Sequence, residues 1–530
     1  MLPVLSNDQT RVVIEVSAKA LRRRFFTAHG AFRALEKAGY WGDEGALFAI
    51  AELLPILEET ILQSKDYRLR ERAIRMMEEV FFRRQRVAFE IELPTIGGAL
   101  CEVSWKEILK RAAASKARPR FANRSLVLEV DHDHVLVTKF MRPQDLLEDL
   151  SNEVKWMLYL KEHSFQKRFV IPEPVAFKGS YLFTVTGIPI DKASHVALHP
   201  KRHAICFTVH KDYFSYPNSP RPSERLSSEE IKEVMTRCAY LLGKLTSLGV
   251  IHTDIIALFH TRVQAKRRLD AGTYCWWQGC VGRLDRWLDS CDWPNLGVSG
   301  IRDFEHFVSF RGSYEELIQH IGNHLLGLFL VTGSYFRNKD RRSVGLDRNR
   351  RPVDTWYLFD RALLRKIVEG IVCSYHEGLT GTRWPGEAFL FDFELLTERM
   401  VAEMGSDHHM IETLRSRHQR EMSASAFREI LRKGGYCEDE IDQLTQGEED
   451  IDIVTGPHLG EFNGEISLPE MVDLIRKVAV LSTMHLFDRL GPSLEKGLAR
   501  EKKEVLDPTM PVTHGRKLPH LRPPLRSHAA

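Results

Sequence analysis

A lysine on a strand-like run and a glutamate in the helix that follows are the first residues whose types and spacing suggest chemistry. Lys139 lies in the run VLVTKF, on the same face as Val137, because side chains alternate along a strand. An ammonium group on an apolar face needs a charged partner. Glu153, 14 residues later in the predicted helix LEDLSNEVKWMLYLKEH, is the expected partner. A lysine held in this way can bind phosphate oxygens, whereas the alternative is a solubilising charge on an edge strand.

Asn295 and Asp303 offer the oxygen ligands that Mg²⁺ prefers. The segment between them, LGVSGIR, predicts a tight hairpin that returns Asp303 to the neighbourhood of Asn295. Mg²⁺ usually takes one or two protein oxygens and completes its shell with phosphates and water. The pair therefore predicts a magnesium site, and the alternative is that Asn295 only begins a turn after Pro294.

A third polar segment, GVIHTDIIALFHTR at 249–262, directly follows the clearest predicted helix of the chain. Apolar residues recur at helical spacing over 231–245. Ser227 and Glu230 predict a capping box at the start of this helix, and Gly249 suits its end. His252 and Asp254 are therefore expected in a loop that a long helix holds in place.

An insert at 260–294 separates this loop from Asn295. The insert includes the basic run RVQAKRRLD and four of the nine tryptophans of the chain, so it is predicted to fold rather than to act as a linker. These four are Trp276, Trp277, Trp287 and Trp293. Basic residues beside tryptophan can bind a second phosphate-bearing ligand, with Arg283 and His252 as the candidates. A small satellite core with a solvated basic edge is the alternative.

The elements that must position these residues change in type along the chain. Residues 1–118 are predicted to be helical, because apolar residues repeat at helical spacing in 47–61 and in DYRLRERAIRMMEEVFFRRQ. The two stretches resemble a HEAT-type helical pair, with a small helical bundle as the alternative. From about residue 120, SLVLEV and VLVTKF predict a hairpin. Helices predominate again after residue 310.

Lys139, Glu153, the junction SLGVIHTD, Asn295 and the segment RDFE together resemble the protein-kinase-like superfamily. The long insert before Asn295 is similar to that of the SidJ-type pseudokinases. The resemblance implies an α+β, bilobal protein-kinase-like fold. It divides the chain into a HEAT-like helical region (1–118), an N-lobe (119–215), a C-lobe (216–400), a helical region (401–499) and a disordered basic tail (500–530).

The same resemblance implies an ATP- and Mg²⁺-dependent transferase that attaches glutamate to a protein side chain through an AMP-linked intermediate. Lys139 would hold phosphates, Glu153 would orient Lys139, and Val137 would cover the adenine. Asn295 and Asp303 would hold the metal.

A second nucleotide pocket would use His252 and Arg283. The partners would be an unidentified protein substrate, free glutamate and an unidentified activator protein. A phosphotransferase that uses Asp254 as the base is the first alternative, and a non-catalytic pseudokinase scaffold is the second.

The sequence departs from the kinase pattern in three places. The hairpin that ends at Lys139 has no glycine-rich loop. Glu305 stands where the segment Asp-Phe-Gly has its glycine, and His306 stands where the SidJ-type effector has another acid.

The bulk composition excludes several classes of partner. The formal net charge of +3 provides no strong field for nucleic acid or membrane. Eight cysteines are scattered in the chain, and Cys275, Cys280 and Cys291 lack a CxxC pair, so ordinary thiols are favoured over a zinc site. The longest apolar run, LLGLFLV, is too short to span a bilayer. A cytoplasmic protein is expected, and secretion as an effector stays open.

Overall fold

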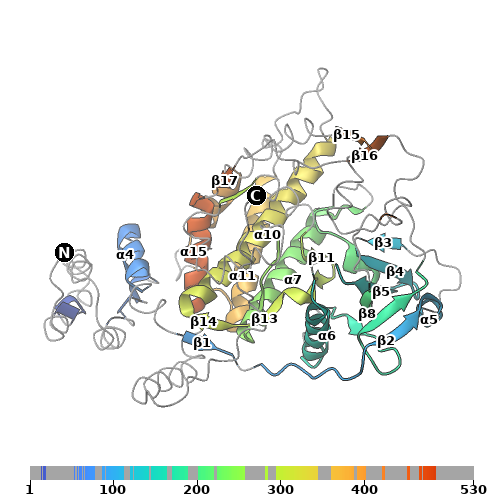
Figure 1. The fold of residues 1–530 in the computed structure, drawn as a ribbon. Helices are drawn as coiled ribbons and strands as arrows, with labels where there is room; N and C mark the ends of the chain where they lie inside the picture. The colour runs from blue at the N-terminus through green and yellow to red at the C-terminus, as the bar shows by residue number, and fades with distance from the viewer. Residues whose placement is uncertain are drawn as a thin grey trace, which may run out of the picture.

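The computed structural model of the 530-residue chain describes residues mainly within 64–77, 86–112, 120–163, 170–188, 201–219, 224–256, 294–343, 360–401 and 465–484. Short gaps occur inside some of these ranges, and a few isolated residues and short strands are described elsewhere. The described part combines helices with a mixed β-sheet (Figure 1).

One seven-stranded sheet provides the strand that bears Lys139. Its order is β2-β7-β8-β5-β4-β3, with β6 paired to β8, and only β2 and β7 run parallel. The strands are β2 (Cys101–Ser104), β3 (Arg120–Ala122), β4 (Ser125–Glu129), β5 (His134–Phe140), β6 (Glu173–Pro174), β7 (Phe183–Thr186) and β8 (His203–His210). The predicted hairpin is confirmed, because β4 pairs antiparallel with β5 and Asp131 accepts the backbone N–H groups of Asp133 and His134 in the turn.

The two faces of this sheet pack against different helices. Val135 and Val137 belong to the core that includes α6 (Leu147–Lys161), whereas Leu136 and Phe140 belong to the core that includes α5 (Trp105–Arg111). The alternation predicted for β5 is therefore confirmed, and it directs Lys139 to the face that α6 covers.

The helical part is built on α7 (Ser228–Ser247), α10 (Tyr314–Ser343), α11 (Arg361–Thr380) and α15 (Pro469–Met484). The capping box of Ser227 and Glu230 is present at the start of α7, and Gly249, with φ of 80°, follows its end. Helices α7 and α11 cross in backbone contact. A Cβ atom on Gly243 of α7 would meet the carbonyl oxygen of Tyr375, and one on Gly378 of α11 would meet that of Tyr240.

Short strands connect the helical part to the site. Strand β9 (Val250–His252) follows α7 and pairs with β13 (Phe307–Ser309). Between them in sequence lies a hairpin of β11 (Leu296–Gly297) and β12 (Gly300–Ile301), followed by the 3₁₀ turn η5 (Phe304–His306).

The expectation that residues 1–118 are entirely helical is wrong. Helix α4 (Tyr67–Met77) lies within the second predicted helical stretch, but β1 (Arg86–Ala88) and β2 are strands. Strand β1 pairs with β14 (Arg311–Ser313), and β2 with β7, so both strands depend on partners far away in sequence. Four residues of CEVS provide too short an alternation to reveal such a strand.

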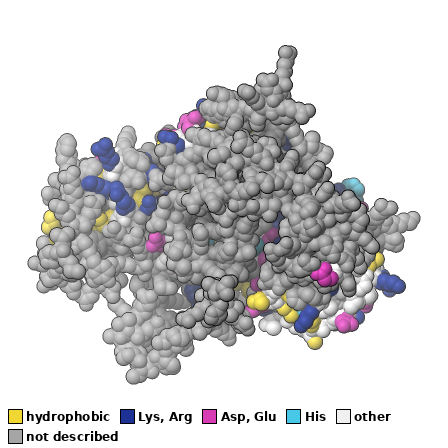
Figure 2. All heavy atoms as spheres, turned by 45° about the horizontal axis from the view of Figure 1, so that its top comes forward, with side chains coloured by type: hydrophobic (Ala, Val, Ile, Leu, Met, Phe, Trp, Pro, Cys, Tyr) yellow, Lys and Arg dark blue, Asp and Glu magenta, His cyan; other side chains and the backbone are white. Residues whose placement is uncertain are grey.

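Figure 2 shows the arginine side chains of α4 gathered on the left of that view.

The region 401–499 also contains strands beside its predicted helices. These are β15 (Arg420–Ser423), β16 (Asp450–Ile453) and β17 (Glu465–Ser467). Strand β10 (Val281–Arg283), from the predicted insert, pairs with β17. The rest of the insert up to residue 293, its tryptophans and cysteines, and the tail 500–530 lie outside the described residues. Among the described residues, no helix combines the length and apolarity needed to cross a membrane.

Candidate functional site

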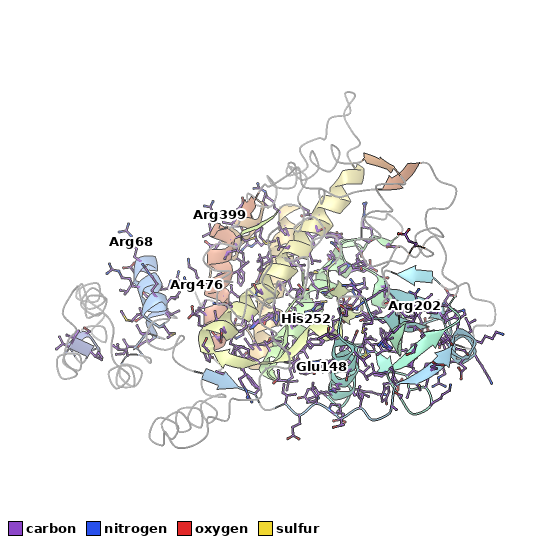
Figure 3. All side chains as sticks on the ribbon, in the orientation of Figure 1. Arg68, Glu148, Arg202, His252, Arg399 and Arg476 are labelled. Carbon is purple, nitrogen blue, oxygen red and sulfur yellow. The ribbon has the colours of Figure 1, made fainter. Side chains whose placement is uncertain are left out.

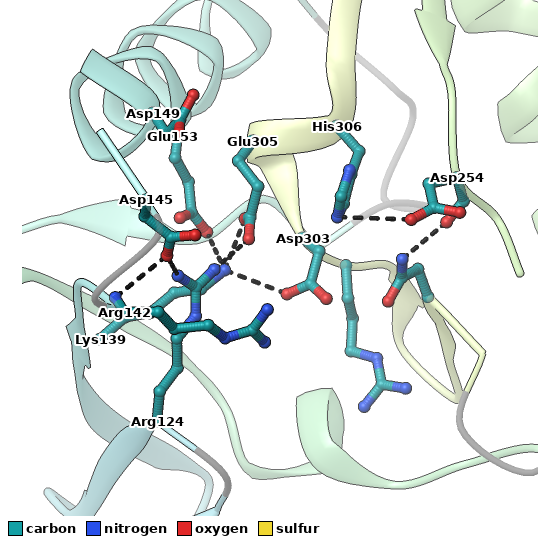
Figure 4. A network of polar contacts seen from close by, with 12 residues as sticks. Arg124, Lys139, Arg142, Asp145, Asp149, Glu153, Asp254, Asp303, Glu305 and His306 are labelled. Atoms are coloured by element: carbon teal, nitrogen blue, oxygen red, sulfur yellow. Dashed lines mark hydrogen bonds and ion pairs between the residues drawn. The ribbon is translucent and has the colours of Figure 1, made fainter. Parts of the chain in front are cut away.

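Lys139 lies at the centre of a buried group of charges. Its Nζ donates to Glu153 Oε1 at 2.8 Å, to Asp303 Oδ1 at 3.1 Å and to Glu305 Oε2 at 2.5 Å (Figure 4). Burial alone would lower the pKa of this lysine, but the three carboxylates raise it above its usual value. Lys139 therefore stays charged, and the structure brings together three of the residues expected to act in catalysis.

Glu153 comes from α6 and is fully buried. Its Oε1 accepts from Lys139, while its Oε2 has no hydrogen-bond partner among the described residues. Burial, and then the nearby charge of Glu305, raise the pKa of Glu153 against the opposing effect of Lys139. This carboxyl therefore orients Lys139, although its burial disfavours its own charged form.

Asp303 reaches Lys139 because the β11–β12 hairpin turns the chain back. Leu296 pairs with Ile301, and the backbone N–H of Arg302 donates to the carbonyl of Asn295 at 2.9 Å. Asp303 itself has a left-handed φ of 55°, which aspartate tolerates better than most residues. Its side chain is 39% exposed, so a ligand can reach it. Burial opposes ionisation of Asp303, but Lys139 outweighs it and holds the pKa of the carboxyl below its usual value.

Asn295 lies beside the loop that holds Asp254. Its Nδ2 donates to the carbonyl oxygen of Asp254 at 2.6 Å, and its backbone N–H donates to Ile255. Because the amide nitrogen is already used, Oδ1 is the side-chain atom that can bind a cation. The hairpin predicted from LGVSGIR is confirmed, and it brings Asn295 next to the residue before Asp303.

Asp254 and His306 face each other on the loop side of the site. Asp254 Oδ2 lies 3.7 Å from His306 Nε2, and Asp254 is only 8% exposed. The ligand atoms of His306, Asp303 and Glu305 lie within 4.8 Å of one another. Within the described residues, Nδ1 of His306 is buried without a hydrogen-bond partner.

His252 is buried between the helices and the sheet (Figure 3). Its Nε2 donates to the carbonyl of Arg302 at 2.9 Å, and its Nδ1 accepts from the backbone N–H of Asp254 at 3.2 Å. Burial, with a smaller effect from His306, lowers the pKa of His252 to about 3, so the ring is neutral. The contact with a second nucleotide expected for His252 stays a prediction, and it requires one of these bonds to open.

A neutral hydrogen-bond network extends from His252 into the helical part. His324 Nε2 donates to the carbonyl oxygen of His252 at 2.9 Å, and His324 Nδ1 accepts from the hydroxyl of Tyr375 at 2.8 Å. The same hydroxyl lies 3.2 Å from the hydroxyl of Thr246. We call His252, His324, Tyr375 and Thr246 the histidine network. It joins α7, α10 and α11 to the strand that precedes Asp254.

The remaining two predicted residues are Val137 and Arg283, and the structure describes the side chain of Val137 only. Val137 is fully buried on β5, two residues before Lys139 and on the same face. Arg283 is the last residue of β10, and its side chain lies outside the described part of the chain.

The structure adds charged residues that sequence reasoning missed. Arg124, at the turn between β3 and β4, donates to Asp145 and to Glu305. Burial would lower the pKa of this guanidinium, but Glu305 and Asp145 raise it further above its usual value. We call Arg124, Lys139, Asp145, Glu153, Asp303 and Glu305 the charged cluster. The only signal in the sequence was Glu305, which replaces a glycine in the segment RDFE.

Arg302 supports the same hairpin from behind. Its guanidinium donates to the backbone carbonyls of Tyr213, Pro294 and Leu296. It also lies over the ring of Tyr216, 3.8 Å from the ring centroid. These contacts hold both ends of the hairpin in place, so they position Asn295 and Asp303 relative to each other.

The residues present fit a phosphate-bearing ligand with a divalent cation. Two permanently charged side chains, Lys139 and Arg124, lie beside Asp303, the one carboxylate of the charged cluster with substantial exposure. Asn295 adds a neutral oxygen, and amide and carboxylate oxygens suit Mg²⁺. No protein-family model matches this sequence, and a search of curated proteins found no significant match.

Proposed function

We propose that this protein is an ATP- and Mg²⁺-dependent transferase of kinase-like fold that modifies a protein side chain. One observation carries the proposal: the ammonium of Lys139 is shared by a carboxylate from α6 and a carboxylate from the loop after β12. Chemistry on a nucleoside triphosphate requires a cation for the phosphates, an anion that orients this cation, and an acid that holds the metal. Lys139, Glu153 and Asp303 are residues of these three types in direct contact.

The arrangement of elements supports a bilobal, kinase-like fold. The strand with Lys139 is followed by the helix with its glutamate, and the helical part begins with α7 and the loop of Asp254. This order matches the kinase pattern in which a strand lysine pairs with a glutamate of the next helix. In the proposed HEAT-like region, the longest described helix is α4, with 11 residues.

Asn295 and Asp303 would hold the magnesium ion. Bound there, Mg²⁺ would neutralise charge on the phosphates and orient them. Val137, buried two residues before Lys139, would lie against the adenine. Lys139 would bind phosphate oxygens while Glu153 keeps its ammonium in place.

Nucleotidyl transfer is favoured over phosphotransfer by the surroundings of Asp254. A kinase base must accept a proton from a substrate hydroxyl, but Asp254 is 8% exposed and its carboxylate faces His306. In the favoured reaction a target carboxylate attacks the α-phosphorus of ATP and releases pyrophosphate. The amine of free glutamate then attacks the acyl carbon, AMP leaves, and the amine loses a proton to solvent.

The position of the label transferred from ATP tests the proposal. Cell proteins are incubated with the full chain, Mg²⁺, glutamate and ATP labelled at the α or the γ position, and intact masses are measured. We expect transient α-label and a mass gain of one glutamate residue per addition, both lost in Asp303→Ala. Transfer of γ-label would indicate a kinase that uses Asp254. If ATP and Mg²⁺ do not raise the melting temperature, the protein is a scaffold without nucleotide.

A further inference from the structure

Glu305 bridges the two cations of the charged cluster. One of its carboxylate oxygens accepts from Arg124 and the other accepts from Lys139. The side chains of all three residues are at most 7% exposed. A carboxylate whose two oxygens each bind a different cation makes the contacts that a phosphate group would make to the same pair.

The three residues come from separate elements. Arg124 lies at the turn between β3 and β4, Lys139 lies on β5, and Glu305 lies in the three-residue turn η5 of the loop that follows β12. The contact therefore joins the sheet to the loop that includes Asp303. Arg124 also lies at a strand turn beside Lys139. At such a position its guanidinium can bind phosphates, as the backbone N–H groups of a glycine-rich loop do in other proteins.

The charges limit what can replace Glu305. Removing one partner of a buried ion pair leaves an uncompensated charge and is strongly unfavourable. Exchange of one anion for another avoids that cost, because both cations keep a counter-charge. Among the other contacts of the two cations, those of Arg124 with Asp145 and of Lys139 with Glu153 involve residues outside the loop of η5 and persist when Glu305 leaves.

We propose that Arg124 and Lys139 form a polyphosphate-binding subsite, and that the carboxylate of Glu305 fills this subsite as a built-in competitor until phosphate displaces it. The inference rests on the proposed function only for the identity of the phosphate as that of ATP. The apparent affinity for the nucleotide then depends on the fraction of the protein in which Glu305 occupies the subsite. This fraction is a property of the chain, because the competitor is part of it.

Calorimetric binding of inorganic tripolyphosphate to the full-length chain tests the subsite without a nucleotide. Glu305→Gln keeps the size of the side chain but removes its charge, so we expect binding to become at least about tenfold tighter than in the wild type. Arg124→Gln in the Glu305→Gln background is expected to reverse this gain.

Glu173→Gln is the matched control, because it makes the same change in an exposed pair with Lys161, outside the charged cluster. We expect its affinity for tripolyphosphate to stay within about threefold of the wild type. Circular dichroism and melting are recorded first. Should Glu305→Gln fail to fold, Glu305→Asp keeps the charge but shortens the side chain, and a smaller tightening is expected.

Two results overturn the inference: affinity in the Glu305 variants that does not exceed that of the wild type, or an equal gain in Glu173→Gln, which would indicate a general effect of net charge. Mg-ATP is titrated in parallel to separate this inference from the proposed function. If Mg-ATP binds wild type and Glu305→Gln equally and tripolyphosphate also shows no gain, the competitor is removed but the proposed function stays intact. Tighter tripolyphosphate binding with no added affinity for Mg-ATP keeps the subsite and removes the nucleotide.

Discussion

The charged cluster and the histidine network are both buried and polar, yet they are held together differently. The cluster joins the sheet, α6 and the loop after β12 through ion pairs around Lys139 and Arg124. The network joins α7, α10 and α11 through hydrogen bonds between neutral groups, and both nitrogens of its two histidines are bonded. In the inference proposed above, the first exchanges a carboxylate for a ligand phosphate, whereas the second has no charged group to exchange. The comparison therefore contrasts a proposed binding site with a network that holds helices and a strand together.

The charged cluster and the histidine network also differ in whether their buried polar atoms all have hydrogen-bond partners. Within the described residues, the cluster leaves Glu153 Oε2 and Arg124 Nε buried without hydrogen-bond partners. A partly satisfied buried group of charges costs stability, and such a cost is typical of sites that bind a ligand. The histidine network has no such atom on either imidazole.

Among the variants that test this comparison, Lys139→Met is expected to have the largest effect on stability and on ligand binding. It leaves Glu153, Asp303 and Glu305 without their shared cation, so we expect the free energy of unfolding to fall by about 3–5 kcal/mol. Binding of Mg-ATP should be lost as well. Denaturant unfolding and calorimetry provide the two measurements.

Lys161→Met is the matched control for that variant. Lys161 pairs with Glu173 at 2.5 Å, but their side chains are 53% and 63% exposed. Exposed pairs contribute less than about 1 kcal/mol, so this variant should stay close to the wild type. Equal losses in the two variants would mean that the cluster is no more important to folding than a surface pair.

Acid sensitivity should come from the histidine network. Burial lowers the pKa of His324 to about 3 from an ordinary value of 6.5. A lowered pKa means that the folded state binds fewer protons than the unfolded state, so the stability from neutral His324 is complete above pH 6.5 and is lost as the pH falls towards 3. For His324→Gln, we expect the slope of unfolding free energy against pH between 6 and 4 to decrease by about 1.4 kcal/mol per pH unit.

Denaturant unfolding at a series of pH values provides this slope. His132→Gln is the control, because His132 lies in the exposed turn between β4 and β5, and we expect it to leave the slope close to that of the wild type. An unchanged slope in His324→Gln would mean that the acid sensitivity does not come from His324.

Asn295→Ala should have the smallest effect on stability and a selective effect on metal dependence. Loss of its hydrogen bond to Asp254 is expected to cost about 1 kcal/mol. The Mg²⁺ concentration for half-maximal protection by ATP should rise by about tenfold or more. Melting curves across a Mg²⁺ series measure both effects.

Asn218→Ala serves as the comparison for Asn295→Ala. Asn218, in a turn that precedes α7, donates to Ser334 of α10 at 2.9 Å, so its loss should lower the melting temperature without changing the Mg²⁺ dependence. Matching shifts in Mg²⁺ dependence for both variants would remove Asn295 from the metal site.

Contacts between residues close in sequence could be predicted. Lys139 and Glu153 are 14 residues apart on a strand and the next helix, and the reversal between Asn295 and Asp303 is a short hairpin. In both cases alternation, helical periodicity and turn residues determine which side chains meet.

Contacts across long separations could not be predicted. Arg124 and Glu305 are 181 residues apart, and they meet only because the sheet and the loop after β12 pack together. Strand β2 was missed for the same reason, since its parallel partner β7 lies about 80 residues away. His252 was assigned to a ligand because its type suggests chemistry, while its two backbone hydrogen bonds depend on a fold that the sequence pattern does not reveal.

The crossing of α7 and α11 has a consequence for motion. Gly243 and Gly378 bring the two backbones so close that neither helix has space for an added methyl group, and this leaves no room for sliding. Tyr375, which anchors His324, lies at this crossing. We therefore expect the loop of Asp254 to stay fixed relative to these helices, and an opening that admits a substrate to come from displacement of the sheet and α6.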